Sequence, residues 1–119
     1  MNVIYLMMDE KKNHALFKAG FAKCIEGSVY AYTTHNPEVR CISTVKTMTK
    51  SKRNVEKMFH DEIVRRGYEM VTAHIDGKKT EWFAVDYNDP FYTALCECGL
   101  CAFTCGKHRK NYGEMIIGA

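Results

Sequence analysis

Two short segments near the start of the chain, separated by a polar turn, constrain its fold more strongly than any other feature. Val3 to Met7 and Ala15 to Phe21 are rich in the apolar and aromatic residues that favour strands. An antiparallel pair of these strands places Tyr5 and Lys18 close together at the edge of a small sheet, just before a helix. A hydroxyl beside an ammonium group at such an edge is a suitable site for a phosphate.

The composition is that of an ordinary globular protein. With 119 residues, 46% of them hydrophobic and 26% charged, we expect a single domain over residues 1–119. No apolar run reaches the roughly 20 residues that span a bilayer, and the N-terminus lacks the pattern of a signal peptide, so no membrane partner is expected. The net charge of +3 permits nucleic acid as a partner. Six cysteines without a secretion signal predict reduced thiols and a cytoplasmic location.

Hydrophobic periodicity and turn residues predict the remaining elements and an α+β fold class. Asn36-Pro37 ends the first helix because a residue before proline avoids the helical region, and Asp89-Pro90 starts the last helix as cap and first turn. Asp76-Gly77 favours a hairpin turn. The predicted elements are a helix over 25–34, a strand over 39–46, a helix over 51–66, hairpin strands over 68–75 and 80–85, and a helix from 89 toward 106.

The helix over 51–66 carries the first candidate chemistry. Its inward stripe is expected to be Val55, Met58, Phe59 and Ile63. Glu56 and His60 lie four residues apart, one turn on the same face, at the margin of this stripe. A carboxylate held there can take one position of a magnesium ion that keeps several waters and shares a substrate phosphate. By spacing alone, a solvated pair at the edge of the stripe is the simpler interpretation.

Four short motifs, in order, resemble the GIY-YIG nuclease superfamily in its phage and large-virus branch. Lys18-Ala19-Gly20-Phe21 is similar to the Lys-Ile-Gly-Phe of that branch. The motifs that follow are Thr34-His35-Asn36-Pro37, then Glu56 with His60, then Glu81-Trp82-Phe83. The resemblance covers about residues 3–85 and leaves a C-terminal helix and tail over 89–119. It implies a small three-stranded antiparallel sheet flanked by helices, with a C-terminal hairpin and an added helix.

The resemblance also implies an activity and the residues that perform it. Members of this superfamily hydrolyse phosphodiester bonds with one divalent metal. The resemblance therefore implies an endonuclease that uses Mg²⁺ or Mn²⁺ and whose partner is nucleic acid, with DNA favoured. Tyr5 takes the place of the first motif tyrosine, Lys18 that of the second, and Glu56 that of the metal carboxylate. Tyr32 falls where many members have histidine or tyrosine, and His60 completes the helix motif.

One position departs from the pattern of the superfamily. An arginine that faces the scissile phosphate is expected eight residues after the motif glycine, but Gly20 is followed at that distance by Ser28. A neutral hydroxyl cannot make the two-pronged charged contact of a guanidinium, and loss of one such donor typically costs on the order of 100- to 1000-fold in rate. The site is therefore weakened, rebuilt with another cation such as Lys23, or retained only for binding. An inactive module that binds nucleic acid or a protein is the alternative function.

The last helix suggests a different chemistry. Cys98, Cys101, Cys105 and His108 share one face of an ideal helix, yet the first and last would lie about 15 Å apart. Zinc ligands lie roughly 2.0–2.3 Å from the metal, so zinc is the less favoured cofactor. The simpler interpretation is an inward stripe made of Phe91, Leu95, Cys98, Ala102 and Cys105. Apolar residues on the opposite side then predict a second buried face, against the tail or against a protein partner such as a second copy; they are Cys96, Leu100 and Phe103.

Basic residues gather in two groups. The first group surrounds the start of the helix over 51–66 and consists of Lys46, Lys50, Lys52 and Arg53. The second lies in the tail and consists of Lys107, Arg109 and Lys110. A phosphate backbone could run along the first group toward Tyr5 and Lys18, helped by the positive potential of a helix N-terminus. An ordinary solvated face explains the same residues equally well.

Overall fold

A five-stranded antiparallel sheet forms the centre of the molecule, in the order β3-β1-β2-β5-β4. The computed structural model describes residues 2–23, 27, 38–47, 52–75 and 78–104. Within them the elements are β1 (Asn2–Glu10), β2 (Ala15–Ala22), β3 (Arg40–Thr47), α2 (Lys52–Arg65), β4 (Met70–Ile75), β5 (Lys78–Val85), α3 (Pro90–Cys98) and the 3-10 helix η1 (Gly99–Thr104). The predicted positions of these strands and of α2 are confirmed to within a few residues, and the helix predicted over 25–34 lies outside the described residues except for Gly27.

The predicted three-stranded sheet is wrong, although the α+β class holds. The C-terminal hairpin is part of the same sheet, because β5 pairs with β2 from Ala15↔Val85 to Phe17↔Phe83. The residues of β5 explain why this strand lies inside the sheet rather than in a separate hairpin. Trp82 is buried on one face of the sheet and Phe83 and Val85 are buried on the other. A strand with large apolar residues on both faces needs covered sheet on both sides.

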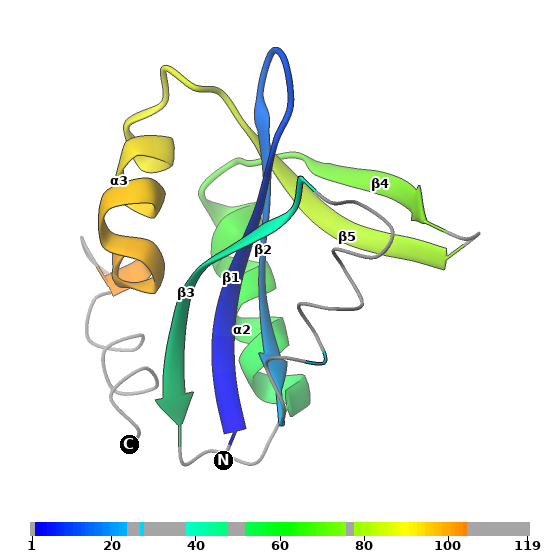
Figure 1. Cartoon of the computed structure of the whole chain (residues 1–119), viewed down its shortest axis with the longest axis vertical. Coiled ribbons are helices and arrows are strands. Elements are labelled where there is room, and N and C mark those ends of the chain that lie inside the picture. The colour runs from blue at the N-terminus through cyan, green and yellow to red at the C-terminus, as the bar shows by residue number, and fades with distance from the viewer. Residues whose placement is uncertain (1, 24–26, 28–37, 48–51, 76–77, 105–119) are drawn as a thin grey trace.

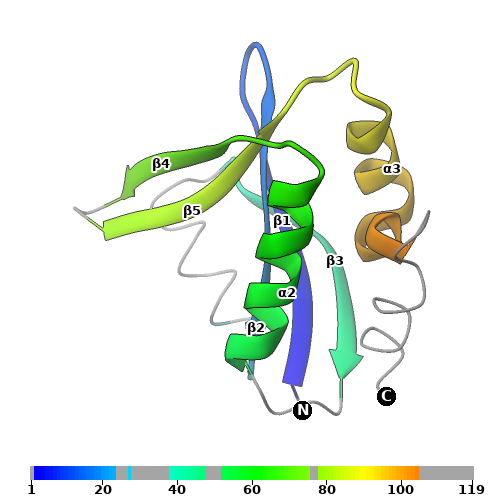
Figure 2. The same ribbon diagram turned by 180° about the vertical axis from the view of Figure 1, so that it is seen from behind.

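Strand alternation separates two clusters of buried residues. Ile4, Leu6 and Met8 of β1 face the larger cluster, which α2, α3 and η1 cover. Figure 2 shows α2 lying across β1 and β2 from this side, with α3 next to β3. The smaller cluster lies on the opposite face and contains Tyr5, Met7, Leu16, Ala22, Val39 and Trp82. The position of a residue along a strand therefore decides which side of the sheet its side chain serves.

Helix α2 packs as its sequence predicts. Val55, Phe59 and Ile63 are buried in the larger cluster, and Met58 packs against it in a partly buried position. Gly67, with φ of +90°, follows the helix in a conformation that residues with a side chain rarely adopt. This regular helix keeps its side chains at the expected angles around its axis.

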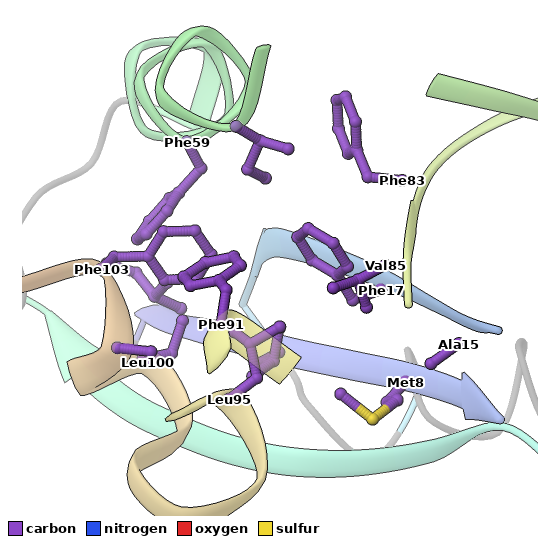
Figure 3. Packing of buried hydrophobic residues seen from close by; sticks show 14 of the residues in the cluster. Met8, Ala15, Phe17, Phe59, Phe83, Val85, Phe91, Leu95, Leu100 and Phe103 are labelled. Carbon is purple, nitrogen blue, oxygen red and sulfur yellow. The ribbon is translucent and has the colours of Figure 1, made fainter. Parts of the chain in front are cut away.

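The predicted continuous last helix is wrong, because α3 ends at Gly99, with φ of +58°. The chain continues as η1, which turns Leu100 and Phe103 into the core, where both are fully buried. Figure 3 shows these two side chains with Phe91 and Leu95 of α3, facing Phe59. Leu100 and Phe103 of the predicted second apolar face therefore pack within this chain, whereas Cys96 is exposed. These two residues need no partner to cover them.

The corrected helix also changes the position of its cysteines. Cys98 was expected in the inward stripe and is exposed, as are Cys96 and Cys101. Phe91, Leu95 and Ala102 are buried as expected. The start of α3 follows the prediction, since Asp89 caps it by accepting a hydrogen bond from the backbone N–H of Phe91 at 2.8 Å. Cys105 lies outside the described residues.

The segment around Gly99 fits tightly against β3. A Cβ atom at Gly99 would lie 2.5 Å from the Cβ of Ser43 and 2.6 Å from its Oγ. The backbone N–H of Leu100 donates a hydrogen bond to the same Oγ at 3.3 Å. Glycine is therefore required here both by its positive φ and by the lack of space for a side chain. Across the described residues, no helix is both long and apolar enough to cross a membrane.

Candidate functional site

Tyr5 lies on the sheet face opposite to α2. It pairs with Gly20 across β1 and β2, and a Cβ atom at Gly20 would lie 2.4 Å from the Tyr5 hydroxyl oxygen. The tyrosine ring therefore extends over the glycine backbone, which explains why this position of β2 carries no side chain. Tyr5 is only 5% exposed and belongs to the smaller buried cluster. It packs as a core residue as well as presenting a hydroxyl near β2.

Lys18 lies on the same face of the sheet as Tyr5. It pairs with Met7, which is two residues along β1 from Tyr5, so Tyr5 and Lys18 are diagonal neighbours on adjacent strands. Such neighbours are roughly 7–8 Å apart, within reach of long side chains. Lys18 is half-buried. The strand pairing thus brings the predicted tyrosine and lysine together.

A stretch of β2 next to these residues forms an edge of the sheet. The described pairing between β2 and β5 stops at Phe17, while β1 continues to pair with β2 as far as Ala22. We call the stretch from Lys18 to Ala22 the β2 edge. In the described part of the chain, β5 diverges from β2 beyond this point, as Figure 1 shows. Lys18 and Gly20 are both part of this edge.

Glu56 and His60 lie on α2, on the other side of the sheet. The ring centroids of His60 and Phe83 are 5.4 Å apart. Phe83 pairs with Phe17, where the pairing of β5 with β2 stops. Since α2 runs antiparallel to β2 (Figure 2), Glu56 is one turn beyond His60 toward the β2 edge. Both side chains are half-buried. The Nδ1 atom of His60 also lies 3.7 Å from Oδ1 of the exposed Asp61.

The predicted site residues therefore do not share one face of the sheet. Tyr5 and Lys18 lie on one face, and Glu56 and His60 lie on α2, which covers the opposite face. A site that uses all of them would have to extend around the β2 edge. The positions of Ser28 and Tyr32, and of Lys50 in the basic group, lie outside the described residues.

Glu56 is the predicted metal ligand, and among the described residues it is one carboxylate rather than part of a closed metal site. Within the described ranges, no three His, Cys, Asp or Glu side chains gather closely enough to hold a metal ion. Mg²⁺ needs no such cage, because it usually takes one or two carboxylates and completes its shell with water and substrate phosphates. Glu56 could supply the carboxylate. The exposed Lys46 and Arg53 of the basic group carry charge suited to a phosphate backbone.

Sequence reasoning missed a buried ion pair at the other end of α2. Glu62 is 3% exposed and accepts hydrogen bonds from Arg65 at 2.7 Å and from Arg66 at 2.7 Å. Burial alone would raise the pKa of Glu62, but the hydrogen bonds from the two guanidinium groups outweigh it, so the pKa lies below its usual value. Arg66 also lies over the ring of Phe91, 4.8 Å from its centroid. Arg65 and Arg66 follow Glu62 by three and four residues, and this spacing on a helix could have predicted the ion pairs from the sequence.

A family model decides how this arrangement is to be classified. The model of the T5orf172 domain matches residues 2–94, which is most of the chain. The chain belongs to the T5orf172 domain family. The match spans the whole sheet, α2 and the first half of α3, so all the elements around the β2 edge lie within the domain.

Membership of the T5orf172 family corrects the predicted resemblance. The matching model is not a GIY-YIG model, so the assignment to that superfamily is wrong. The resemblance rested on short motifs, and such motifs do not separate one nuclease-related family from another. T5orf172 is itself a nuclease-related family, which supports a nucleic-acid-related role. No match was found among curated proteins or among solved structures.

Proposed function

We propose that this T5orf172 domain hydrolyses phosphodiester bonds of nucleic acid, with DNA as the favoured substrate, and depends on Mg²⁺ or Mn²⁺. The observation that carries the proposal is the match of the nuclease-related T5orf172 domain over residues 2–94, which include Lys18 on β2 and Glu56 on α2. A lysine supplies a cation for phosphate, and a carboxylate supplies a ligand for the metal. A nucleic-acid substrate also agrees with the expected cytoplasmic location.

Each candidate site residue has a distinct role in this proposal. Lys18 binds a phosphate oxygen, and the Tyr5 hydroxyl orients the phosphate or the attacking water. Glu56 would hold the metal, and a bound Mg²⁺ would stabilise the charge that develops on the phosphate oxygens. His60, one turn from Glu56, can donate or accept a hydrogen bond through its imidazole nitrogens. We propose a further supporting role for Tyr32.

The test is cleavage of supercoiled plasmid and of single-stranded DNA and RNA in the presence of Mg²⁺ or Mn²⁺. We expect Glu56→Gln to lower the cleavage rate by about 100-fold or more, because the carboxylate is lost while the shape is kept. Glu97→Gln is the matched control, since Glu97 is an exposed carboxylate on α3 and receives the same substitution. Cleavage that survives Glu56→Gln, or that falls equally in the control, would contradict the proposed role of Glu56.

A second candidate function is a module that binds nucleic acid without cleaving it. The observations that favour it are the burial of Tyr5 and the separation of Tyr5 and Lys18 from α2 by the sheet. In that case no cleavage is detected with any substrate, and affinity falls steeply as salt rises because phosphate contacts release counterions. Removal of charge at Lys46 and Arg53 would then flatten the salt dependence. Salt-independent binding, or none at low salt, would point to a protein partner instead.

A further inference from the structure

The exposed cysteines at the end of α3 form a feature that the proposed function does not use. Free cysteine is among the residue types most often buried, yet Cys96, Cys98 and Cys101 are all exposed thiols. Two of them stand in a Cys-x-x-Cys arrangement, Cys98-Gly99-Leu100-Cys101, across the junction of α3 and η1. This spacing is common where two thiols act together in thiol–disulfide exchange.

The structure places Cys98 and Cys101 on one exposed side of this junction. From Cys98 to Phe103, exposure recurs every third residue, with Gly99 and Leu100 buried between the two cysteines and Ala102 and Phe103 buried after them. Gly99, with φ of +58° and ψ of −132°, has the conformation of the second residue of a type II′ turn. Cys98 and Cys101 are therefore the first and last residues of one tight turn.

Cys96 does not belong to this pair. It is two residues before Cys98 on a regular helix, and side chains at that spacing do not face each other. Its sulfur instead forms a hydrogen bond with the hydroxyl of Tyr92, which is one helical turn earlier. Cys96 is therefore a matched control: it is equally exposed and on the same element, but faces another direction.

The distance that closure requires is small. The Cα atoms at the two ends of a tight turn lie less than about 7 Å apart, and the Cα atoms of a disulfide usually lie roughly 4.4–6.8 Å apart. Leu100 and Phe103 are anchored in the core, and the Leu100 N–H is bonded to Ser43. Gly99 lies between the cysteines and is packed against Ser43, so the backbone of the turn stays in place. Closure then needs rotation of the two cysteine side chains.

We propose that Cys98 and Cys101 form a redox-active dithiol that closes to an intramolecular disulfide by exchange with a small-molecule disulfide. One thiolate attacks a sulfur of the small disulfide, which forms a mixed disulfide and releases one small thiolate. The second cysteine thiolate attacks the protein sulfur of the mixed disulfide and releases the second small thiolate. The dithiol loses two electrons and two protons, and the small disulfide is reduced to two thiols.

The experiment uses the full-length protein with glutathione disulfide as the probe. Reduced protein is equilibrated with glutathione and glutathione disulfide at a series of ratios, quenched with N-ethylmaleimide, and analysed by intact mass and by peptide mapping. We expect a species that has lost two hydrogen atoms and carries two fewer maleimide groups. In the map, the peptide with Cys98 and Cys101 should contain an internal disulfide, a result that needs no variant and therefore no assumption about folding.

Single substitutions then identify the pair. Cys98→Ser and Cys101→Ser should each lose the internal disulfide and retain a glutathione adduct on the remaining thiol, while Cys96→Ser should retain the disulfide. Circular dichroism checks that each variant is folded. Three outcomes would each overturn the proposal. The first is that the unmodified protein forms glutathione adducts and no internal disulfide, and the second is that Cys96→Ser loses the disulfide. The third is that Cys105→Ser loses it and the map shows a link between Cys101 and Cys105.

Discussion

Helix α2 and the α3–η1 segment cover the same face of the sheet but use their sequences differently. Both contribute aromatic residues to one core, where the ring centroids of Phe59 and Phe103 are 5.0 Å apart. In α2 the helical period is unbroken, and Glu56 and His60 lie at the margin of the buried stripe as predicted. In α3–η1 the period changes at Gly99, which buries Leu100 and Phe103 and exposes Cys98. A single backbone change thus decides which side chains are available for chemistry.

The contact between the two segments gives the largest expected effect. Phe103→Ala should destabilise the fold by about 3–5 kcal/mol, because it removes a fully buried ring and leaves a cavity. Phe59→Ala should cost a similar amount, and the double variant should cost less than the sum, because the edge-to-face contact is lost only once. Urea unfolding measures all three. Val64→Ala on the exposed face of α2 is the control and should change little.

Additive losses from Phe59→Ala and Phe103→Ala would show that the two segments are stabilised independently. The regular helix α2 and the broken segment α3–η1 would then not form one cooperative core.

A second prediction concerns Gly99, the residue at which the α3–η1 segment departs from the regular helical period that α2 keeps. Gly99→Ala should cost about 1–3 kcal/mol from its positive φ, and more from the approach of the new Cβ to Ser43. Gly67→Ala, after α2, is a matched control with φ of +90° but no atom within 4 Å of the new Cβ. Gly67→Ala should therefore lower the stability only through the positive φ and not through a steric clash. Thermal unfolding of the two variants separates backbone strain from lack of space.

If the two glycine variants were equally stable, close packing against Ser43 would contribute nothing at Gly99. Ser43→Gly in the Gly99→Ala background should restore part of the lost stability, and no restoration would lead to the same conclusion.

The smallest expected effect tests the buried carboxylate of α2. The pKa of Glu62 is lowered in the folded protein, so its stabilising contribution is complete above the unfolded value and is lost as pH falls through the folded value. Glu62→Gln should therefore cost about 1–2 kcal/mol at neutral pH and less near pH 3, which lies below the unfolded value, while Arg65 and Arg66 stay charged throughout. The partial exposure of Arg65 keeps the effect modest.

Denaturant unfolding at both pH values measures this difference. Asp61→Asn is the control, since the pKa of Asp61 is also lowered, through its hydrogen bond with Lys57, but its carboxylate is exposed. An equal loss for Glu62→Gln at both pH values would mean that the side chain contributes by packing rather than by charge.

Local features of the chain were predictable from its sequence. The stripe of α2, the cap at Asp89 and the strand positions follow from side-chain periodicity and turn chemistry, which depend on residues a few positions apart. The proximity of Tyr5 and Lys18 also followed from sequence, since only a short turn joins β1 and β2. These parts needed no knowledge of distant segments.

Only the tertiary structure decided how the local elements combine. The pairing of β5 with β2 joins residues far apart in the chain and makes the sheet five-stranded, and the point where that pairing stops creates the β2 edge. Gly99, where α3 ends, packs against Ser43 of β3, a residue far away in the sequence. The burial of Glu62 likewise depends on its tertiary surroundings. Periodicity reports which residues prefer to be buried, but the burial itself depends on contacts between distant segments, which no local pattern contains.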